Sequence, residues 1–423
     1  MLRRSTLPGF PFHCWGVGLC LMLMAWPGWS GTFNLEQALQ LAVSQHPVIS
    51  QRRNQQEAAQ GMLASAQSGR WPSFSGQTGK DYVGKTTLTL RVEQPLWTGG
   101  RLTAQIDEAD AGVRSAAAAL EESQQDIMVR TATTFTELGR LEARIAAARA
   151  NLVEHARLHA MILNRIDNQI TPSSDGILAS ARLAQAKAEL NQNLVLSARA
   201  RTSLAQLLGQ QVTGLVDPVS PQWQQTPLDQ VIDSALVHSP TLRRLQALAE
   251  AASAATNVRR GQALPQVMLR HDNTRGGQDP QSTTYVAIEY MTGAAGLASY
   301  AQIREAEARY QASLADIEMA KRNTVEAVGA DWADLQSFHA QTRDLQAQVE
   351  AQAQVHESYV RQYVVGRKNW IELLNAQREL ALARYALADT QWGLLRSHLR
   401  LQIATGELNA AALSGPTASH PHD

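Results

Sequence analysis

The sequence predicts a mainly α protein with a small β part, in which long antiparallel helical hairpins accompany four β-strands in an internally duplicated chain. Three observations lead to this fold class: short motifs recur in both halves, two long segments have helical periodicity, and short segments alternate polar and apolar residues. Aromatic residues are only 5% of the 423 residues, so the core must be built from small side chains. The 38 basic and 38 acidic residues cancel, whereas a nucleic-acid-binding protein normally carries a basic surplus. We therefore expect no nucleic-acid partner.

Residues 1–30 have the pattern of a secretory signal peptide. Two arginines precede an apolar run that is too short to span a bilayer as a mature helix. The small residues Gly28 and Ser30 predict cleavage after residue 30. Cys20 would allow lipidation instead, but the residue before it is the large Leu19. Both cysteines lie in this segment, so we expect no disulfide in the mature chain.

The duplication divides the mature chain. Residues 35–39 resemble residues 228–232, and residues 104–109 resemble residues 301–306, at a nearly constant offset. Copies of this length are too long for a solenoid repeat and indicate a duplicated domain. We expect a first repeat at residues 31–216, a Pro- and Gln-rich linker at 217–227, a second repeat at 228–408 and a disordered tail at 409–423.

Each repeat is expected to begin with two short helices. The first, at Leu35–Gln45 or Leu228–His238, should end before a proline, because proline restricts the preceding residue to extended conformations. The second should continue to about Gly69 or Gly261, where the strand signals begin.

The longest helices are expected at Arg101–Asp167 and at residues 299–365. Neither segment contains proline, and Leu138, Leu141 and Ile145 recur at steps of three and four. This is the spacing of a coiled-coil seam.

Short breaks at residues 171–176 and 366–369 are expected to end the two long helices. The return helices, at residues 175–209 and 369–406, are about half as long. Each long helix would therefore form an antiparallel hairpin with its return helix and pack its remaining length on the two short helices.

Four strands are expected, at about residues 73–81 and 86–96 in the first repeat and at about 264–272 and 283–291 in the second. Their alternation predicts a sheet with one apolar and one polar face. No stretch of 18 apolar residues follows residue 31, so the mature chain is either a soluble exported protein or an outer-membrane protein built on strands. Four strands cannot close a membrane barrel, and an open edge cannot lie in lipid. Strands that cross a membrane would therefore require several chains to share one barrel.

Two motifs, read together with the duplication, resemble the TolC-like outer-membrane efflux family. Residues 94–101, Gln-Pro-Leu-Trp-Thr-Gly-Gly-Arg, resemble its strand-to-helix junction, and residues 363–377 resemble its second helical turn. The resemblance covers nearly all of residues 32–408. It implies a homotrimer with a shared 12-stranded barrel in outer-membrane lipid of a Gram-negative bacterium, four strands coming from each chain. The helices would continue it as an α-barrel through the periplasm.

The resemblance also implies partners: an inner-membrane transporter and a periplasmic adaptor protein. The helical tips around the two turns would contact the adaptor. These tip residues are Thr171, Pro172, Ser173, Gly366 and Arg367.

The same resemblance places a periplasmic constriction at Glu372 and Asn375. The family often has an acid at the second position, so here the resemblance implies one acidic ring, of three Glu372 side chains. Like charges around a narrow axis raise one another's pKa and favour cations. An ordinary solvated helix carboxylate is the alternative interpretation of Glu372. Asp175, Tyr363 and Lys368 match positions that tie neighbouring helices in the closed state.

Nothing in the sequence indicates catalysis. His155 and His159 are four residues apart, a spacing that metal ligands use, but no third ligand is evident and an ordinary helix surface explains them. Gly99 and Gly100 open a helix but lack the pattern of a phosphate-binding loop. We expect no metal, no cofactor and no enzymatic activity.

The resulting hypothesis is a passive exit duct. The first turn, residues 168–175, departs from the Gly-Leu step of drug-pump members and is more like members that serve protein secretion. This favours type I protein secretion with an ABC transporter as partner. The alternatives are the outer-membrane component of a drug or small-molecule efflux pump and, from another class, a periplasmic coiled-coil adaptor without a pore.

Overall fold

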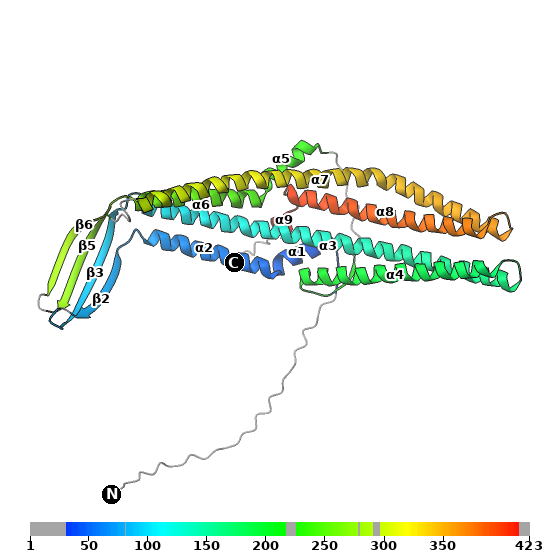
Figure 1. Cartoon of the computed structure of the whole chain (residues 1–423), viewed down its shortest axis with the longest axis horizontal. Helices are drawn as coiled ribbons and strands as arrows, with labels where there is room; N and C mark the ends of the chain where they lie inside the picture. The colour runs from blue at the N-terminus through cyan, green and yellow to red at the C-terminus, as the bar shows by residue number, and fades with distance from the viewer. Residues whose placement is uncertain (1–30, 81, 217–225, 278–279, 291–296, 414–423) are drawn as a thin grey trace, which may run out of the picture.

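The structure is a computed structural model that describes residues 31–80, 82–216, 226–277, 280–290 and 297–413. The expected signal peptide, most of the expected linker at 217–227 and most of the expected tail lie outside these residues. The expected fold class is confirmed, because long helices make up most of the chain and a small sheet lies at one end of them (Figure 1). Among the described residues, no helix is both long and apolar enough to cross a membrane.

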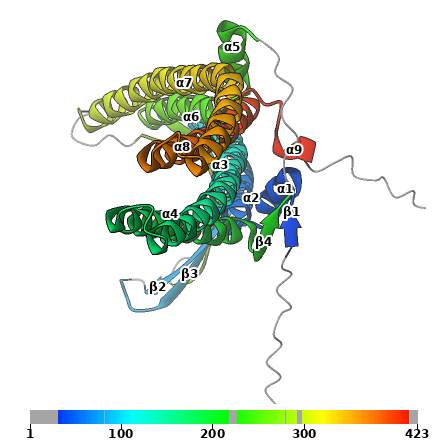
Figure 2. The ribbon, with the colours of Figure 1, turned by 90° about the vertical axis from the view of Figure 1, so that its right-hand side faces the viewer.

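Two helical hairpins form most of the molecule. Helix α3 (Arg101–Asp167) returns as α4 (Ser173–Leu208), and α7 (Leu297–Val364) returns as α8 (Trp370–Ala404). At about 1.5 Å per residue, the 67 residues of α3 extend for about 100 Å. Figure 2, which views the molecule from the end with the turns, shows α7, α8, α3 and α4 following one another in one curved layer.

Four short helices pack on the long ones, two of them in the half next to the sheet and two near the middle of the molecule (Figure 1). They are α1 (Leu35–Gln45), α2 (Pro47–Ser68), α5 (Leu228–His238) and α6 (Pro240–Gln262). Helices α2 and α6 each begin with a proline, and at the first position of a helix the missing N–H costs no intrahelical hydrogen bond. The preceding residue caps the new helix: Ser239 Oγ accepts from the backbone N–H of Leu242 at 3.3 Å. Helix α2 packs against α3, and α6 packs against both α3 and α7.

Strands from both repeats form one antiparallel sheet. The strands are β2 (Ser73–Lys80), β3 (Thr86–Trp97), β5 (Gln266–Gly276) and β6 (Gln281–Glu289), in the order β2-β3-β5-β6. The pairing of β3 with β5 joins the hairpin of the first repeat to that of the second. The outer edges of β2 and β6 have no partner strand among the described residues.

The strands of the second hairpin begin and end at other residues than expected. Strand β5 continues to Gly276, whereas the sequence pattern predicted its end at residue 272 and a loop at 273–280. The prediction was wrong because the polar residues after position 272 were interpreted as a loop. In the sheet they pair with β3 and β6, as Asn273 does with Leu90 and Ser282.

Two further elements were not expected. Strand β1 (Gly31–Phe33) pairs in parallel with β4 (Val212–Leu215), which joins the start of the first repeat to its end. Helix α9 (Ala410–Leu413) lies in the segment that was expected to be disordered. That expectation is corrected for these residues, because Leu413 is buried in an apolar cluster with Leu39.

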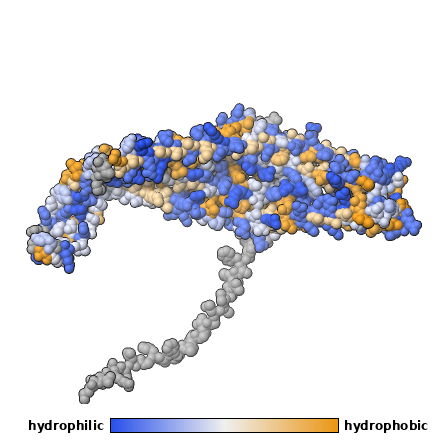
Figure 3. Space-filling model, in the orientation of Figure 1, coloured by the Kyte–Doolittle hydropathy of each residue, from blue (hydrophilic) through white to orange (hydrophobic). Residues whose placement is uncertain are grey.

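Small residues allow the long helices to approach closely. A Cβ atom added to Gly139 of α3 would lie 2.1 Å from the ring of Trp392, and one added to Gly393 would lie 2.9 Å from the ring of Phe338. These aromatic side chains therefore pack into the space that each glycine leaves on the facing helix, which keeps the interior closely packed. On the outside, hydrophilic and apolar residues are interspersed along the visible face of the helical layer (Figure 3).

Candidate functional site

The two helical turns lie together at the end of the molecule opposite the sheet (Figure 1). In the first turn, Gln169 adopts a positive φ of 57°, and the N–H of Ile170 donates to the carbonyl of Arg165. Helix α4 then starts after Pro172, and the hydroxyl of Thr171 donates to Asp175 Oδ2 at 3.4 Å. The expected tip residues thus form a compact, hydrogen-bonded turn.

The second turn depends on a glycine and a capping box. Gly366 has a φ of 76°, a conformation that glycine adopts without steric cost. Asn369 then caps α8: its side chain accepts from the backbone N–H of Glu372 at 2.8 Å. In return, Glu372 Oε2 accepts from the backbone N–H of Asn369 at 3.1 Å. This reciprocal pair fixes the start of α8.

Glu372 is bound within its own chain. Lys368 Nζ lies 2.7 Å from Glu372 Oε1. The hydrogen bonds from Lys368 and from the backbone N–H of Asn369 lower the pKa of Glu372 below its ordinary value. The carboxylate is therefore held ionised, but a cation from one turn earlier offsets its charge.

Asn375, the other expected constriction residue, lies on the open face of α8. This face carries the exposed residues Ile371, Asn375, Arg378 and Leu382, which recur at helical spacing. Because each residue advances about 100° around a helix, Glu372 lies about a quarter turn from Ile371. The structure thus places Asn375 at the centre of the open face and Glu372 at its margin.

Tyr363 ties the two hairpins together inside one chain. Its side chain is only 5% exposed, and its ring centre lies 5.6 Å from that of Trp370. The guanidinium of Arg165, from α3, lies over the same ring at 4.9 Å. Burial raises the pKa of the Tyr363 phenol, and the charge of Asp175 also raises it.

Of the three expected closed-state ties, Tyr363 and Asp175 lie near enough across the hairpins to interact electrostatically, but the buried hydroxyl of Tyr363 makes no hydrogen bond to Asp175. Lys368 does not join them, because its ammonium contacts Glu372 and lies over the ring of Tyr359 at 4.6 Å.

A second contact between the hairpins was not predicted. His356 Nε2, from α7, lies 3.3 Å from Glu154 Oε1, from α3. Burial disfavours the charge of Glu154, but the hydrogen bonds from Arg157 and the nearby imidazole of His356 outweigh it and lower the pKa of Glu154 to about 2. Nearer the middle of the layer, Gln377 donates to Asn151 at 2.8 Å in a buried contact. No local motif signals these pairs, because their members are far apart in the sequence.

The two histidines considered as metal ligands have separate environments. His155 is 7% exposed, and burial lowers its pKa. His159 Nε2 instead lies 3.0 Å from Ser180 Oγ. Over the part of the chain that the structure describes, no three His, Cys, Asp or Glu side chains are placed to hold a metal ion.

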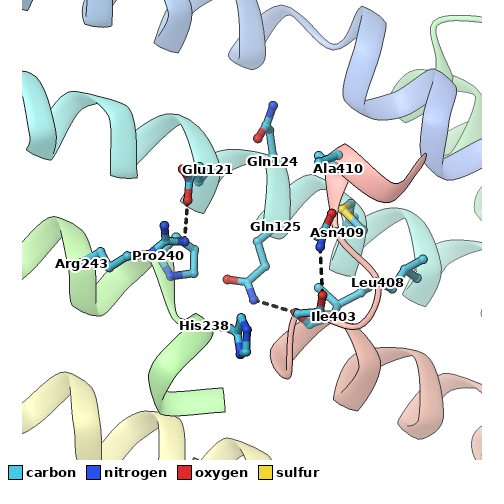
Figure 4. Close-up of a pocket in the computed structure, with 13 residues that line it drawn as sticks. Glu121, Gln124, Gln125, His238, Pro240, Arg243, Ile403, Leu408, Asn409 and Ala410 are labelled. Carbon is cyan, nitrogen blue, oxygen red and sulfur yellow. Dashed lines mark hydrogen bonds and ion pairs between the residues drawn. The ribbon is translucent and has the colours of Figure 1, made fainter. Parts of the chain in front are cut away.

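A cavity of about 370 Å³ lies far from the turns, between α3, the start of α6 and the end of α8 (Figure 4). Several of its polar groups are paired within the wall. Glu121 forms an ion pair with Arg243, and Gln125 donates to the carbonyl of Ile403 at 3.0 Å. These pairs explain the cavity as a gap between helices, with α9 forming part of its wall.

Comparison with known proteins gives matches over most of the chain. The family model described as outer membrane efflux protein matches residues 38–210 and 231–407. Protein CyaE of Bordetella pertussis is 27% identical over 90% of this chain and 85% of its own length. The outer membrane efflux protein BepC of Brucella suis is 22% identical over 80% of this chain and 76% of its own length. The outer membrane protein VceC of Vibrio cholerae superposes with a TM-score of 0.77 at 20% identity, covering 88% of this chain and 96% of VceC.

Proposed function

The chain belongs to the outer membrane efflux protein family, and on that premise we propose that it is the exit duct of a type I protein secretion system. Proteins of this family are passive outer-membrane channels that extend into the periplasm of Gram-negative bacteria, and they are not enzymes. They form trimers and work with an inner-membrane transporter and a periplasmic adaptor. A coiled-coil adaptor without a pore, the alternative from another class, is therefore excluded.

The observation that carries the duct is the open four-stranded sheet at the end of a helical layer about 100 Å long. The backbone groups along the outer edges of β2 and β6 need partners, because unpaired peptide groups are costly in lipid. Pairing β2 of one copy with β6 of the next satisfies both edges. Three copies would then close a shared 12-stranded barrel above a ring of helices.

We place the resting constriction at the α7–α8 turn, around Glu372 and Asn375. Tyr363 and Asp175 would hold it by tying the two hairpins, and Lys368 would act through its ion pair with Glu372. The constriction would dilate when the second hairpin, α7 and α8, moves away from α3. Glu372→Gln tests the ring in planar bilayers: reduced cation preference supports a role for Glu372, and an unchanged reversal potential contradicts it.

The adaptor would bind the exposed tips of the two turns. The residues proposed to contact it are Thr171, Pro172, Ser173, Gly366 and Arg367. In the first turn, the segment Thr-Pro-Ser-Ser-Asp supports a protein-exporting partner of the ABC type. The similarity to BepC, an outer membrane efflux protein, supports the second candidate function, small-molecule efflux.

Photocrosslinking from the tips separates the two candidates. A crosslinkable residue at Ser173 or Lys368 should capture an adaptor together with an ATP-driven transporter, and deletion of the gene should remove one or more proteins from the culture medium. Capture of a proton-driven transporter, with increased drug sensitivity and an unchanged set of secreted proteins, would identify a drug-efflux duct instead. A crosslinkable residue at Lys187, on the exposed side of α4 away from the turns, is the control.

A further inference from the structure

The two faces of the sheet differ in charge as well as in polarity. On one face, Arg91 lies 2.7 Å from Asp272, and Arg270 lies 2.6 Å from Glu93. Arg270 also forms an ion pair with Glu289. This face therefore carries a ladder of matched charges that crosses the sheet from β3 to β6, and we refer to it as the ladder face.

The opposite face is apolar over much of its area. Because side chains alternate along a strand, Leu88, Leu90 and Val92 of β3 point away from Arg91. The register places Phe74 of β2 beside Val92 on this same face. Val286 and Ile288 continue it on β6, and Phe74 and Ile288 are 78% and 72% exposed. In a membrane sheet the apolar face is the one that meets lipid, so we refer to it as the lipid face.

Three basic side chains interrupt the lipid face. The register pairs Lys80 with Thr86, His271 with Val92 and Arg275 with Leu88, which puts all three on the lipid face. Lys80 and Arg275 lie near the hairpin loops, at the end of the sheet away from the helices (Figure 1). The helices extend into the periplasm, so this end lies at the outer surface of the membrane.

None of the three has an acidic partner in the described part of the sheet. All three acids of the four strands, Glu93, Asp272 and Glu289, lie on the ladder face. On the lipid face, Arg275 Nε donates to Asn273 at 3.3 Å and His271 Nδ1 lies 2.7 Å from Thr284 Oγ1. Both of these partners are neutral. Cations at a lipid boundary are costly unless an anion pairs with them, and here the anion must come from outside the strands.

We propose that Lys80 and Arg275 bind the phosphorylated headgroup of an anionic lipid in the outer leaflet, whereas His271 lies four residues farther along β5, level with Val92. Arginine and lysine are the usual protein partners of phosphate oxygens. Lys80 and Arg275 lie on strands two apart in the sheet, a separation of about 10 Å across the strands. The apolar residues below them would contact the acyl chains of the same lipid. This inference rests on the proposed function, because it requires the sheet to lie in the outer membrane.

Lipid retention by the full-length trimer in detergent tests the proposal. The probe is a glycolipid that carries two phosphate monoesters, compared with its dephosphorylated form, and the readout is the amount of lipid that co-elutes with each protomer. The double variant Lys80→Gln, Arg275→Gln should retain at least fivefold less of the phosphorylated lipid. Lys187→Gln, which removes an exposed lysine of α4, should retain as much as the wild type.

Equal retention by the double variant and the wild type would overturn the proposal, as would equal retention of the dephosphorylated lipid. Displacement of the lipid by millimolar inorganic phosphate would assign the site to a free anion instead. If the double variant fails to form a heat-resistant trimer, the two single variants replace it, and each should lose about half of the retention. Conductance of the same samples separates the two hypotheses: a wild type that does not conduct contradicts the duct, whereas conducting samples with equal lipid retention contradict only the lipid site.

Discussion

At the scale of single residues, glycine determines how closely the hairpins approach. Gly139 leaves room for the ring of Trp392, which packs between α1, α3 and α8 near the middle of the layer. The close approach of α3 and α8 therefore depends on the absence of a single Cβ atom.

Gly139→Ala should destabilise the chain by about 1–3 kcal/mol, because the new methyl group would force the Trp392 ring to move. Gly112→Ala is the matched control on the same helix, since nothing lies within 4 Å of its Cβ position. The control should be neutral or stabilising by up to about 1 kcal/mol. Urea unfolding followed by circular dichroism measures both, and equal stabilities of the two variants would contradict the packing argument.

Glu154 should make stability depend on pH in the acid range. Its pKa falls from an ordinary value of 4.5 to about 2 in the folded chain. A lowered carboxyl pKa contributes stability that is fully present above about pH 4.5 and is lost as pH falls toward 2. The contribution is at most about 3 kcal/mol, and partial exposure of the side chain reduces it.

Glu154→Gln should therefore flatten the fall in unfolding free energy between pH 5 and about pH 2. Glu357→Gln is the control, because Glu357 pairs with Arg361 on the exposed surface of the same end of the molecule. Denaturation at a series of pH values measures the slope. A slope as steep in Glu154→Gln as in the wild type would show that the ionised Glu154 does not stabilise the fold through its contacts with Arg157 and His356.

At the scale of elements, the short helix α9 packs against the core after the end of the second repeat. Helix α9 covers the end of α8 and inserts Leu413 among Leu39, Met128 and Leu399. Asn409 caps it by accepting from the backbone N–H of Ala412 at 2.8 Å. The segment therefore belongs to the folded core although it comprises only four residues.

A chain that stops after Asn409 should lose about 2–4 kcal/mol, because it removes the buried Leu413 and leaves its pocket open. A chain that stops after Leu413 keeps these contacts and should be as stable as the full-length protein. Thermal unfolding of the trimer compares the two. Equal melting temperatures would mean that α9 contributes nothing to the stability of the core.

The long helices could be predicted closely from the sequence, and the short elements could not. Proline-free periodicity over dozens of residues predicted α3, whose observed bounds are Arg101–Asp167. Strands β1 and β4 have three and four residues, too few to show alternation, and they pair only because the fold brings the ends of the repeat together. Glu154 and His356 escaped prediction for the same reason, since only the packing of α3 near α7 brings them into contact.

At the scale of the whole molecule, the turn region combines rigid and separable parts. Within each turn, hydrogen bonds and caps fix the backbone. Between the hairpins at the turn end, the guanidinium of Arg165 lies over the ring of Tyr363, whereas polar contacts such as that of Glu154 with His356 lie farther from the turns. Such contacts allow the hairpins to separate without unfolding either turn.

Tyr363→Ala should increase the conductance of the trimer several-fold, because the tie between α7 and α3 loses its central ring. Tyr310→Ala, far from the turns on the same helix, should leave the conductance unchanged. Single-channel recording in planar bilayers gives both values. An unaltered conductance in Tyr363→Ala would place the resting closure elsewhere in the duct.

The junction of β3 with β5 has a consequence for the origin of the protein. Each half of the chain supplies one hairpin, and hydrogen bonds between halves unite them. An ancestral protein that corresponded to one half of this chain would have needed twice as many subunits to complete the same barrel. Fusion of two such genes would have turned half of the seams between subunits into seams within a chain, after which the halves were free to diverge, as their different turn sequences now show.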